Sequence, residues 1–175
     1  MKKIMMTLLA ALSVGTAFAW PDKNVSVVVP FPAGGSTDMI GRAIASKLQD
    51  KFGGVFIVDN KAGATGTIGA GMVAKAAPDG HTLLVASLGP YVVAPHLLAK
   101  VPYDALKEFD YITVAVQAPN VLVVPANSRF KTLAELIAYL KANQDKVTFA
   151  SSGNGSSDHL TAELFWLQTG TSGLH

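Results

Sequence analysis

Two short turns in this sequence share a composition that suits the binding of an anion. Residues 35–38 read GSTD and follow an apolar run that ends at Val29, and residues 155–158 read GSSD and follow a run that ends at Ala150. Each turn precedes a stretch with helical spacing, so each lies where a strand gives way to a helix. The first N–H groups of a helix have no partner within it, and the helix dipole adds partial positive charge there. A carboxylate or phosphate can therefore bind at such a turn without a buried lysine or arginine.

Helix capping is the alternative interpretation of both turns. Many α/β proteins have Gly-Ser-rich turns that only cap helices, and Asp38 and Asp158 are then favourable first-turn acids. The recurrence of the turn in two separate halves of the chain favours a shared ligand. Either carboxylate would repel an anion that it faced. We therefore expect both aspartates to brace the loop backbone rather than to touch a ligand.

Strand and helix patterns alternate in the first half of the chain. Their order predicts an α/β fold with a mainly parallel sheet and right-handed crossovers. In such sheets ligands bind beyond the carboxyl ends of the strands, where the first turn lies. The predicted strands are 24–29, 55–58 and 82–86, and the predicted helices are 39–52, 68–77 and a short one at 95–98, with residues 36–38 as the N-cap region of the first helix.

The second half predicts a further sheet with two helices. Apolar runs indicate strands at 111–116, 121–124 and 147–150. Thr132 and Glu135 have the spacing of a capping box and begin a helix that runs to about position 142. The last predicted helix covers 158–168 and is closed by Gly170.

The first 19 residues have the layout of a signal peptide. Lys2 and Lys3 precede an uncharged apolar run, and residues 17–19 read AFA, a small-x-small cleavage pattern. The two lysines account for the excess of 14 basic over 12 acidic residues, so the rest of the chain is balanced and its charge gives no indication of nucleic-acid binding. The chain has no cysteine, which excludes thiol catalysis and cysteine-bound metal sites in it.

Other chemical motifs fail on their context. Residues 69–74 fit a dinucleotide-binding string by letters but lie inside a predicted helix, and no Gly-Lys-Ser/Thr phosphate loop occurs. The four histidines lack metal-ligand spacing, and we expect His81 to be a strand-edge residue. We therefore expect neither a metal nor a cofactor. An exported hydrolase that uses Ser156 or Ser157 with His159 is disfavoured, because sequence neighbours at a helix start point to different faces and no Gly-x-Ser-x-Gly elbow exists.

With these motifs in place, the sequence resembles the substrate-binding receptors of tripartite tricarboxylate transporters, often called Bug receptors. The matching strings are collinear and cover nearly all of residues 20–171. They are VVPFPAGGSTD at 28–38, GTIGA at 66–70, APDGHTLL at 77–84, APNVLVV at 118–124 and ASSGNGS at 150–156.

The resemblance implies a monomeric, non-enzymatic periplasmic receptor with two lobes that close on a small carboxylate, either an organic acid or an amino acid. The implied partners are inner-membrane transporter subunits or a sensor. In the family the ligand is held largely by backbone amides, hydroxyls and ordered water. The implied ligand-binding residues here are Phe31, Ala33, Gly34, Gly35, Ser36 and Thr37 in the first lobe, Ser87 after the third strand, and Ser151, Ser152, Asn154, Gly155 and Ser156 in the second lobe.

The chain also departs from the family pattern, because family members are roughly twice as long. We expect residues 20–108 to form the first lobe and residues 109–175 an incomplete second lobe. A truncated remnant that binds nothing is therefore a further alternative.

Overall fold

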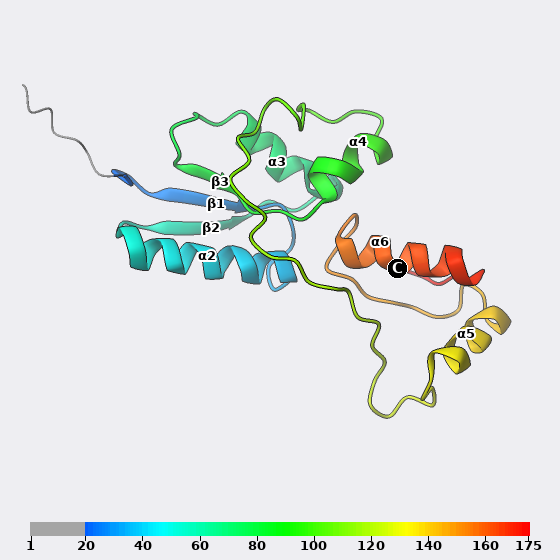
Figure 1. Cartoon of the computed structure of the whole chain (residues 1–175). Coiled ribbons are helices and arrows are strands. Elements are labelled where there is room, and N and C mark those ends of the chain that lie inside the picture. Colours follow the sequence, from blue (N-terminus) through cyan, green and yellow to red (C-terminus); the bar gives the residue numbers. More distant parts are fainter. Residues whose placement is uncertain (1–19) are drawn as a thin grey trace, which may run out of the picture.

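The computed structural model describes residues 20–175, so the predicted signal peptide lies outside the described residues. Its centre is a parallel three-stranded sheet in the order β2-β1-β3 (Figure 1). The strands are β1 (Val25–Val29), β2 (Phe56–Asn60) and β3 (Thr82–Leu84). Val27 of β1 lies opposite Val58 of β2 and Leu83 of β3, which fixes the register of the sheet. The predicted α/β class with parallel strands is confirmed.

The central strand is buried because helices cover both faces of the sheet. Helix α2 (Ser36–Phe52) lies on one face and α3 (Thr67–Ala74) on the other, as Figure 1 shows. Val25 and Val27 are fully buried with Ala45 of α2 and Phe56 in one cluster, and Ala70 of α3 packs in a second. A strand with two covered faces needs apolar residues at successive positions, which explains why the sequence of β1 does not alternate.

Short helical turns connect the remaining elements of the first half. The 3₁₀ turn η1 (Ala64–Gly66) leads into α3, and the π-helical turn η2 (Gly89–Val93) leads into α4 (Ala94–Leu97). The predicted helix at 95–98 therefore begins earlier than expected, and the one at 68–77 ends earlier. Within residues 20–175 no helix combines the length and the apolar character needed to cross a membrane.

The second half contains α5 (Leu133–Ala142) and α6 (Ser157–Thr169). The predicted capping box is confirmed, because Thr132 Oγ1 accepts from the Glu135 amide while the Glu135 carboxylate accepts from the Thr132 amide. Gly170 closes α6 in the left-handed conformation, as expected. Local signals of this kind are readable from sequence because both partners lie within one turn.

The three strands predicted in the second half are wrong as extended sheet elements. Residues 111–124 form an irregular exposed segment, and the 147–150 run makes one parallel bridge, between Thr148 and Leu174. Ile112 is 81% exposed and Val123 is 78% exposed. A β-strand is defined by its partner, and within residues 20–175 no neighbouring backbone pairs with 111–124.

Gly41 permits the close packing of α2 on the sheet, which yields a test. A Cβ at this position would lie 2.7 Å from Cγ2 of Val29, a stiff and fully buried side chain. Glycine-to-alanine changes in exposed helices stabilise by about 1 kcal/mol. Here we expect Gly41→Ala to lower the free energy of unfolding by about 1–3 kcal/mol, the usual range for overpacking.

Urea unfolding followed by circular dichroism measures this change. Ser46→Ala on the exposed side of the same helix is the control and should leave the midpoint nearly unchanged. A Gly41→Ala variant that is more stable than the parent would show that helix propensity, rather than contact with Val29, dominates at this position.

Candidate functional site

The loops that lead into the two Gly-Ser turns, far apart in sequence, line one open cavity. It has a volume of about 440 Å³ and is lined by Pro32, Ala33, Gly34, Gly35, Ser151, Ser152 and Gly153. We call residues 30–35 the first loop and residues 151–156 the second loop. The ideal Cβ position of Gly35 lies 3.4 Å from Cβ of Ser152, so the two loops are in contact. Figure 1 shows α2 and α6 starting near the carboxyl end of β1, the expected position for a ligand in an open α/β sheet.

The first loop ends in an uncapped helix. Gly35 is the N-cap of α2 and has no side chain to accept from the first amides, so the prediction that residues 36–38 cap this helix is wrong. The first bond of the helix runs from the Met39 amide to the Gly35 carbonyl at 3.0 Å. The amides of Ser36 and Thr37 come before this bond and have no side-chain cap. The partial positive charge of α2 is therefore available to an anion in the adjoining cavity.

Asp38 holds the first loop in place from beneath. The residue is 2% exposed, and its carboxylate accepts from the Gly34 amide at 2.8 Å, from Arg42 Nε at 2.9 Å and from Asn60 Nδ2 at 2.9 Å. Asn60 Nδ2 also donates to the Phe31 carbonyl at 3.1 Å. The hydrogen bonds from Arg42, Gly34 and Asn60 lower the pKa of Asp38 to about 2. The expectation that Asp38 braces the backbone is confirmed.

Asp158 does the same for the second loop. Its carboxylate accepts from the Ser152 amide at 2.7 Å and from Ser152 Oγ at 2.8 Å and 2.9 Å. Burial alone would raise the pKa of Asp158, but interactions with Ser156 and Ser152 outweigh burial and lower it. This aspartate therefore also braces backbone, as expected.

The two turns nevertheless differ in the donors that they leave available. Helix α6 is capped by its own Ser156, whose Oγ accepts from the His159 amide at 3.3 Å. The Gly155 amide donates to Nδ1 of His159 at 3.1 Å, and Ser151 Oγ lies 2.7 Å from Nε2 of His175. Most hydrogen-bond donors of the second loop therefore already have partners within the chain, whereas the first amides of α2 have no side-chain partner.

The remaining predicted site residues lie in different surroundings. Phe31 is buried, and its ring packs beneath Gly89 and Gly153. Asn154 is exposed. The hydroxyl of Ser87 is buried and has no hydrogen-bond partner among the described residues. An unpaired buried hydroxyl costs stability, and Ser87 is not among the residues that line the cavity.

Sequence reasoning missed four residues that shape the site. Arg42 and Asn60 hold Asp38, Thr65 packs against Gly155, and His159 accepts from the second loop. The spacing of Asp38 and Arg42, four apart on one helix, was a usable signal. The position of Asn60 at the carboxyl end of a parallel strand was another. No local pattern pointed to the contact of Thr65.

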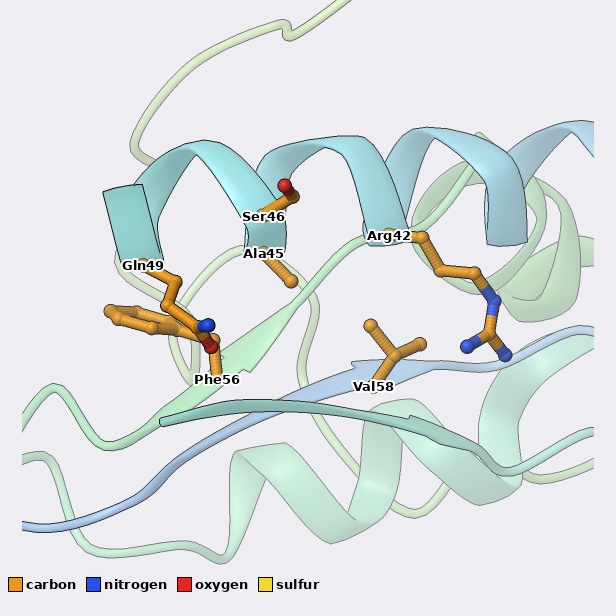
Figure 2. A pocket seen from close by; sticks show the side chains of 6 residues that line it. All are labelled: Arg42, Ala45, Ser46, Gln49, Phe56 and Val58. Atoms are coloured by element: carbon orange, nitrogen blue, oxygen red, sulfur yellow. The ribbon is translucent and has the colours of Figure 1, made fainter. Parts of the chain in front are cut away.

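A second cavity, of about 310 Å³, runs between α2 and the edge strand β2. Figure 2 shows Arg42 at one end of it and Gln49 and Phe56 at the other, with Ala45, Ser46 and Val58 between them. Arg42 is the charged side chain of this lining, and Asp38 and Asn60 already bind its guanidinium. This cavity contains none of the predicted site residues.

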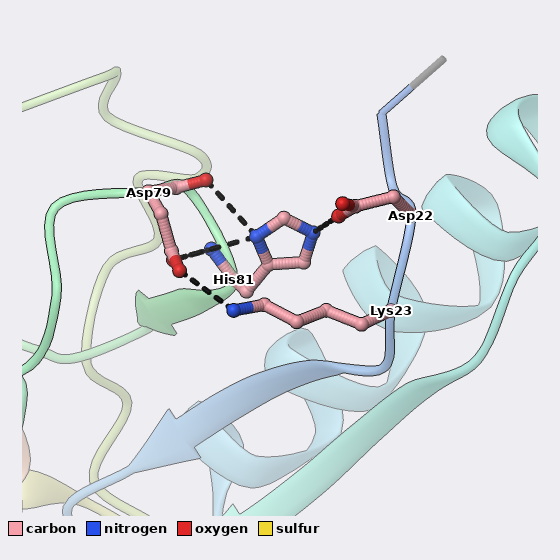
Figure 3. A network of polar contacts seen from close by, with 4 residues as sticks. All are labelled: Asp22, Lys23, Asp79 and His81. Atoms are coloured by element: carbon pink, nitrogen blue, oxygen red, sulfur yellow. Dashed lines mark hydrogen bonds and ion pairs between the residues drawn. The ribbon is translucent and has the colours of Figure 1, made fainter. Parts of the chain in front are cut away.

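A polar cluster around His81, directly before β3, joins Asp22, Lys23 and Asp79 (Figure 3). His81 Nδ1 is 3.0 Å from the Asp79 carbonyl oxygen, and Nε2 is 2.9 Å from Asp22 Oδ1 without the alignment of a hydrogen bond. Lys23 Nζ binds Asp79 Oδ2 at 2.7 Å. The cluster fastens residues 22–23 to the turn before β3. Among the described residues, no three histidine or carboxylate side chains form a group that could hold a metal ion.

Comparisons with known proteins identify relatives over most of the chain. The family model described as "Tripartite tricarboxylate transporter family receptor" matches residues 40–175. Protein BugT of Bordetella pertussis is 40% identical over 156 residues, which are 89% of this chain and 48% of that protein. A UPF0065 protein of Pseudomonas sp. (strain P51), from the tcbD-tcbE intergenic region, is 41% identical over 90% of this chain and 46% of its own length.

Solved structures of similar proteins match the same part of the chain. The R. palustris protein Rpa4515 with adipate superposes with a TM-score of 0.82 at 34% identity, over 89% of this chain and 52% of that one. MatC from Rhodopseudomonas palustris with bound malate gives a TM-score of 0.79 at 33% identity, over 89% and 53% of the two chains. The periplasmic binding protein BugD gives 0.71 at 32% identity, over 89% and 52%. The chain thus spans about half the length of the relatives it matches.

The bracing of the first loop by Asp38 predicts a pH dependence of stability. Because its pKa is lowered in the folded protein, Asp38 stabilises the fold fully above its unfolded value near 4, and this stability is lost as the pH falls towards 2. Asp38→Asn loses the charge that attracts Arg42. We expect this variant to melt several degrees lower than the parent at pH 7 and to lose less stability between pH 4 and pH 2.

Thermal melts across this pH range measure both effects. Asp50→Asn, which removes an exposed carboxylate from its pair with Lys47 on the same helix, is the matched control and should melt like the parent at pH 7. Parallel melting curves for the parent and Asp38→Asn at every pH would contradict the assigned role of Asp38.

Proposed function

Because this chain belongs to the tripartite tricarboxylate transporter receptor family, we propose that it captures a small carboxylate in the cavity between the first and second loops. One observation carries the proposal. The uncapped start of α2 borders a cavity of a size typical of small-ligand sites, and no lysine or arginine lines that cavity. Free amides at a helix N-terminus are the remaining source of positive potential there, and they suit a carboxylate.

Charge balance at the first loop supports this assignment. Asp38 places a carboxylate beneath the first loop, but Arg42 pairs with it at 2.9 Å and offsets its charge. The loop therefore gains a rigid brace without a net negative charge that would repel the ligand. Adipate and malate, the ligands in the structures of two relatives, are both dicarboxylates. We propose a dicarboxylate as the first ligand class to examine.

The proposed ligand-binding set keeps all the residues expected from sequence, with divided roles. Gly35, Ser36 and Thr37 supply amides and hydroxyls at the start of α2, and Ser87 supplies its unpaired hydroxyl. The second loop forms the facing wall. The other members of the set are Phe31, Ala33, Gly34, Ser151, Ser152, Asn154, Gly155 and Ser156.

We further propose the organisation that accompanies this function. Residues 1–19 act as a signal peptide for export to the periplasm, residues 20–108 form the first lobe, and residues 109–175 belong to the second. The receptor is a monomer that delivers its ligand to inner-membrane transporter subunits or to a sensor.

The geometry argues against the hydrolase alternative. Nδ1 of His159 is occupied by the Gly155 amide, so this ring does not activate Ser156. Ser151 Oγ does lie 2.7 Å from Nε2 of His175, but among the described residues no carboxylate pairs with His175 to orient it. We therefore propose a binding protein rather than an enzyme.

Isothermal titration against acetate, malate, adipate and citrate tests the ligand class. We expect measurable heat with at least one dicarboxylate, and weaker binding of acetate because it presents a single carboxylate. A cooperative thermal melt of the same preparation establishes that the protein is folded. A folded protein that gives no heat with any of the four acids would refute the proposed ligand class.

A pair of substitutions at Gly35 tests the site itself. The ideal Cβ of Gly35 makes ordinary contact with Ser152 at 3.4 Å, and the backbone φ of −74° suits any residue. We expect Gly35→Ala to bind within about threefold of the parent, because its methyl fits. Gly35→Val adds methyl groups towards the cavity and should weaken binding at least tenfold, or about 1.4 kcal/mol. Equal affinities for parent and valine variant would place the ligand elsewhere.

A further inference from the structure

His159 occupies a position that restricts its protonation state. The Gly155 amide donates to Nδ1 of its ring at 3.1 Å. A backbone N–H can only donate, so Nδ1 must carry a lone pair and the ring must be neutral, with its proton on Nε2. Nε2 lies 3.5 Å from Oε1 of Glu163, one turn further along α6. The hydrogen bond from the Gly155 amide alone therefore specifies the tautomer, and the Glu163 carboxylate lies beside the other nitrogen.

The amide that donates to His159 belongs to Gly155, a residue through which the second loop contacts the first half of the chain. Gly155 is buried with φ of +76°, a conformation that side chains rarely adopt. A Cβ at Gly155 would overlap Cγ2 of Thr65. The carbonyl oxygen of Gly155 lies 2.9 Å from the ideal Cβ position of Gly89. The backbone of Gly155 therefore rests directly against the first half of the chain. Any movement of this residue displaces the second loop from that contact.

We propose that neutral His159 is a positioning residue that fixes the second loop, and that protonation of Nδ1 releases the loop and weakens carboxylate binding. The binding part of this inference rests on the proposed function. A proton on Nδ1 turns an acceptor into a donor that faces the Gly155 N–H. The buried amide then loses its partner, and the loop must shift to find another. Histidine is the side chain whose ordinary charge change lies between about pH 5 and 8, so the experiments below cover that range.

Three side chains besides the Gly155 amide surround the ring. The Glu163 carboxylate faces it from one turn further along α6. The ring of His175 stacks on it with centroids 4.2 Å apart. Phe149 packs against both rings and adds no charge. Asp158, the preceding residue, is bonded to Ser152.

The neighbouring contact of His175 provides an internal contrast. Its Nε2 lies 2.7 Å from Ser151 Oγ, also in the second loop. A hydroxyl can donate or accept, so this contact tolerates a proton on the histidine. The Gly155 amide has no such freedom. The loop should therefore respond to the proton on His159 and be indifferent to the one on His175.

Nuclear magnetic resonance without ligand tests the positioning role directly. We expect ¹⁵N spectra of the purified chain at pH 8 to show His159 as the Nε2–H tautomer. Between pH 8 and pH 5 the Gly155 amide should shift together with the His159 titration, and its hydrogen exchange should accelerate at least tenfold beyond the intrinsic effect of pH. His175→Asn should preserve this coupling. A proton on Nδ1 at pH 8, or a Gly155 amide that does not follow His159, would overturn the proposal.

Malate titrations at pH 7.5 and pH 6.0 test the consequence for binding. His159→Asn offers an acceptor oxygen near the place of Nδ1 and cannot take a proton, whereas His159→Leu has no acceptor. We expect the asparagine variant to bind within about threefold of the parent at pH 7.5 and to lose the parent's additional weakening at pH 6.0. The leucine variant should bind at least tenfold more weakly at both values.

The NMR experiment and the malate titrations together distinguish a failure of the positioning role from a failure of the ligand assignment. Protonation of malate itself is common to all variants, so an asparagine variant with the same pH slope as the parent would overturn the proposed effect on binding. No malate binding by the parent at either pH, with the amide coupling present in the spectra, would instead count against malate as the ligand and leave the positioning role of His159 intact.

Discussion

The site depends on one buried carboxylate. Asp38 sits beneath the first loop, where it joins the Gly34 amide, the Arg42 guanidinium and the Asn60 amide group. These partners come from the loop after β1, from α2 and from the end of β2. One side chain therefore fixes the loop, the helix that follows it and the neighbouring strand in a single arrangement. Because Arg42 offsets the charge, the brace does not repel an anion above it.

The second loop is also held by an aspartate, but its helix start differs. Asp158 also braces backbone, but Ser156 caps α6 and His159 binds the Gly155 amide. Similar sequences thus produce one helix start without a side-chain cap and one that its own Ser156 caps. The physical difference is the N-cap residue, since Gly35 has no side chain with which to accept and Ser156 has a hydroxyl. We interpret the first loop as the source of positive potential and the second as the wall that closes on the ligand.

Sequence predicted those features that depend on contacts within one element. The strands of the first half, the capping box at Thr132 and the Gly170 terminus of α6 follow from local spacing and were confirmed. The predicted strands at 111–116 and 121–124 were wrong, because an apolar run forms a strand only when another backbone pairs with it. Among residues 20–175 no backbone pairs with this segment, and side chains such as Ile112 are exposed.

The candidate site was predictable in location but not in detail. Two recurring turns were enough to place the loops at the ends of helices, and Asp38 and Asp158 brace them as expected. The absence of a side-chain cap on α2 was missed, because residues 36–38 have side chains suited to capping and were predicted as the N-cap region. The contacts of Thr65 and His159 with Gly155 were missed because they depend on how the second loop rests on the first half of the chain.

The most direct test of this account is a map of backbone amide shifts during titration of the labelled protein with adipate. We predict that the largest changes occur at Gly35, Ser36 and Thr37, with smaller ones at Ser151 and Gly153 across the cavity. Changes confined to the groove between Arg42 and Gln49, or to the cluster around His81, would contradict the assignment of the ligand to the two loops.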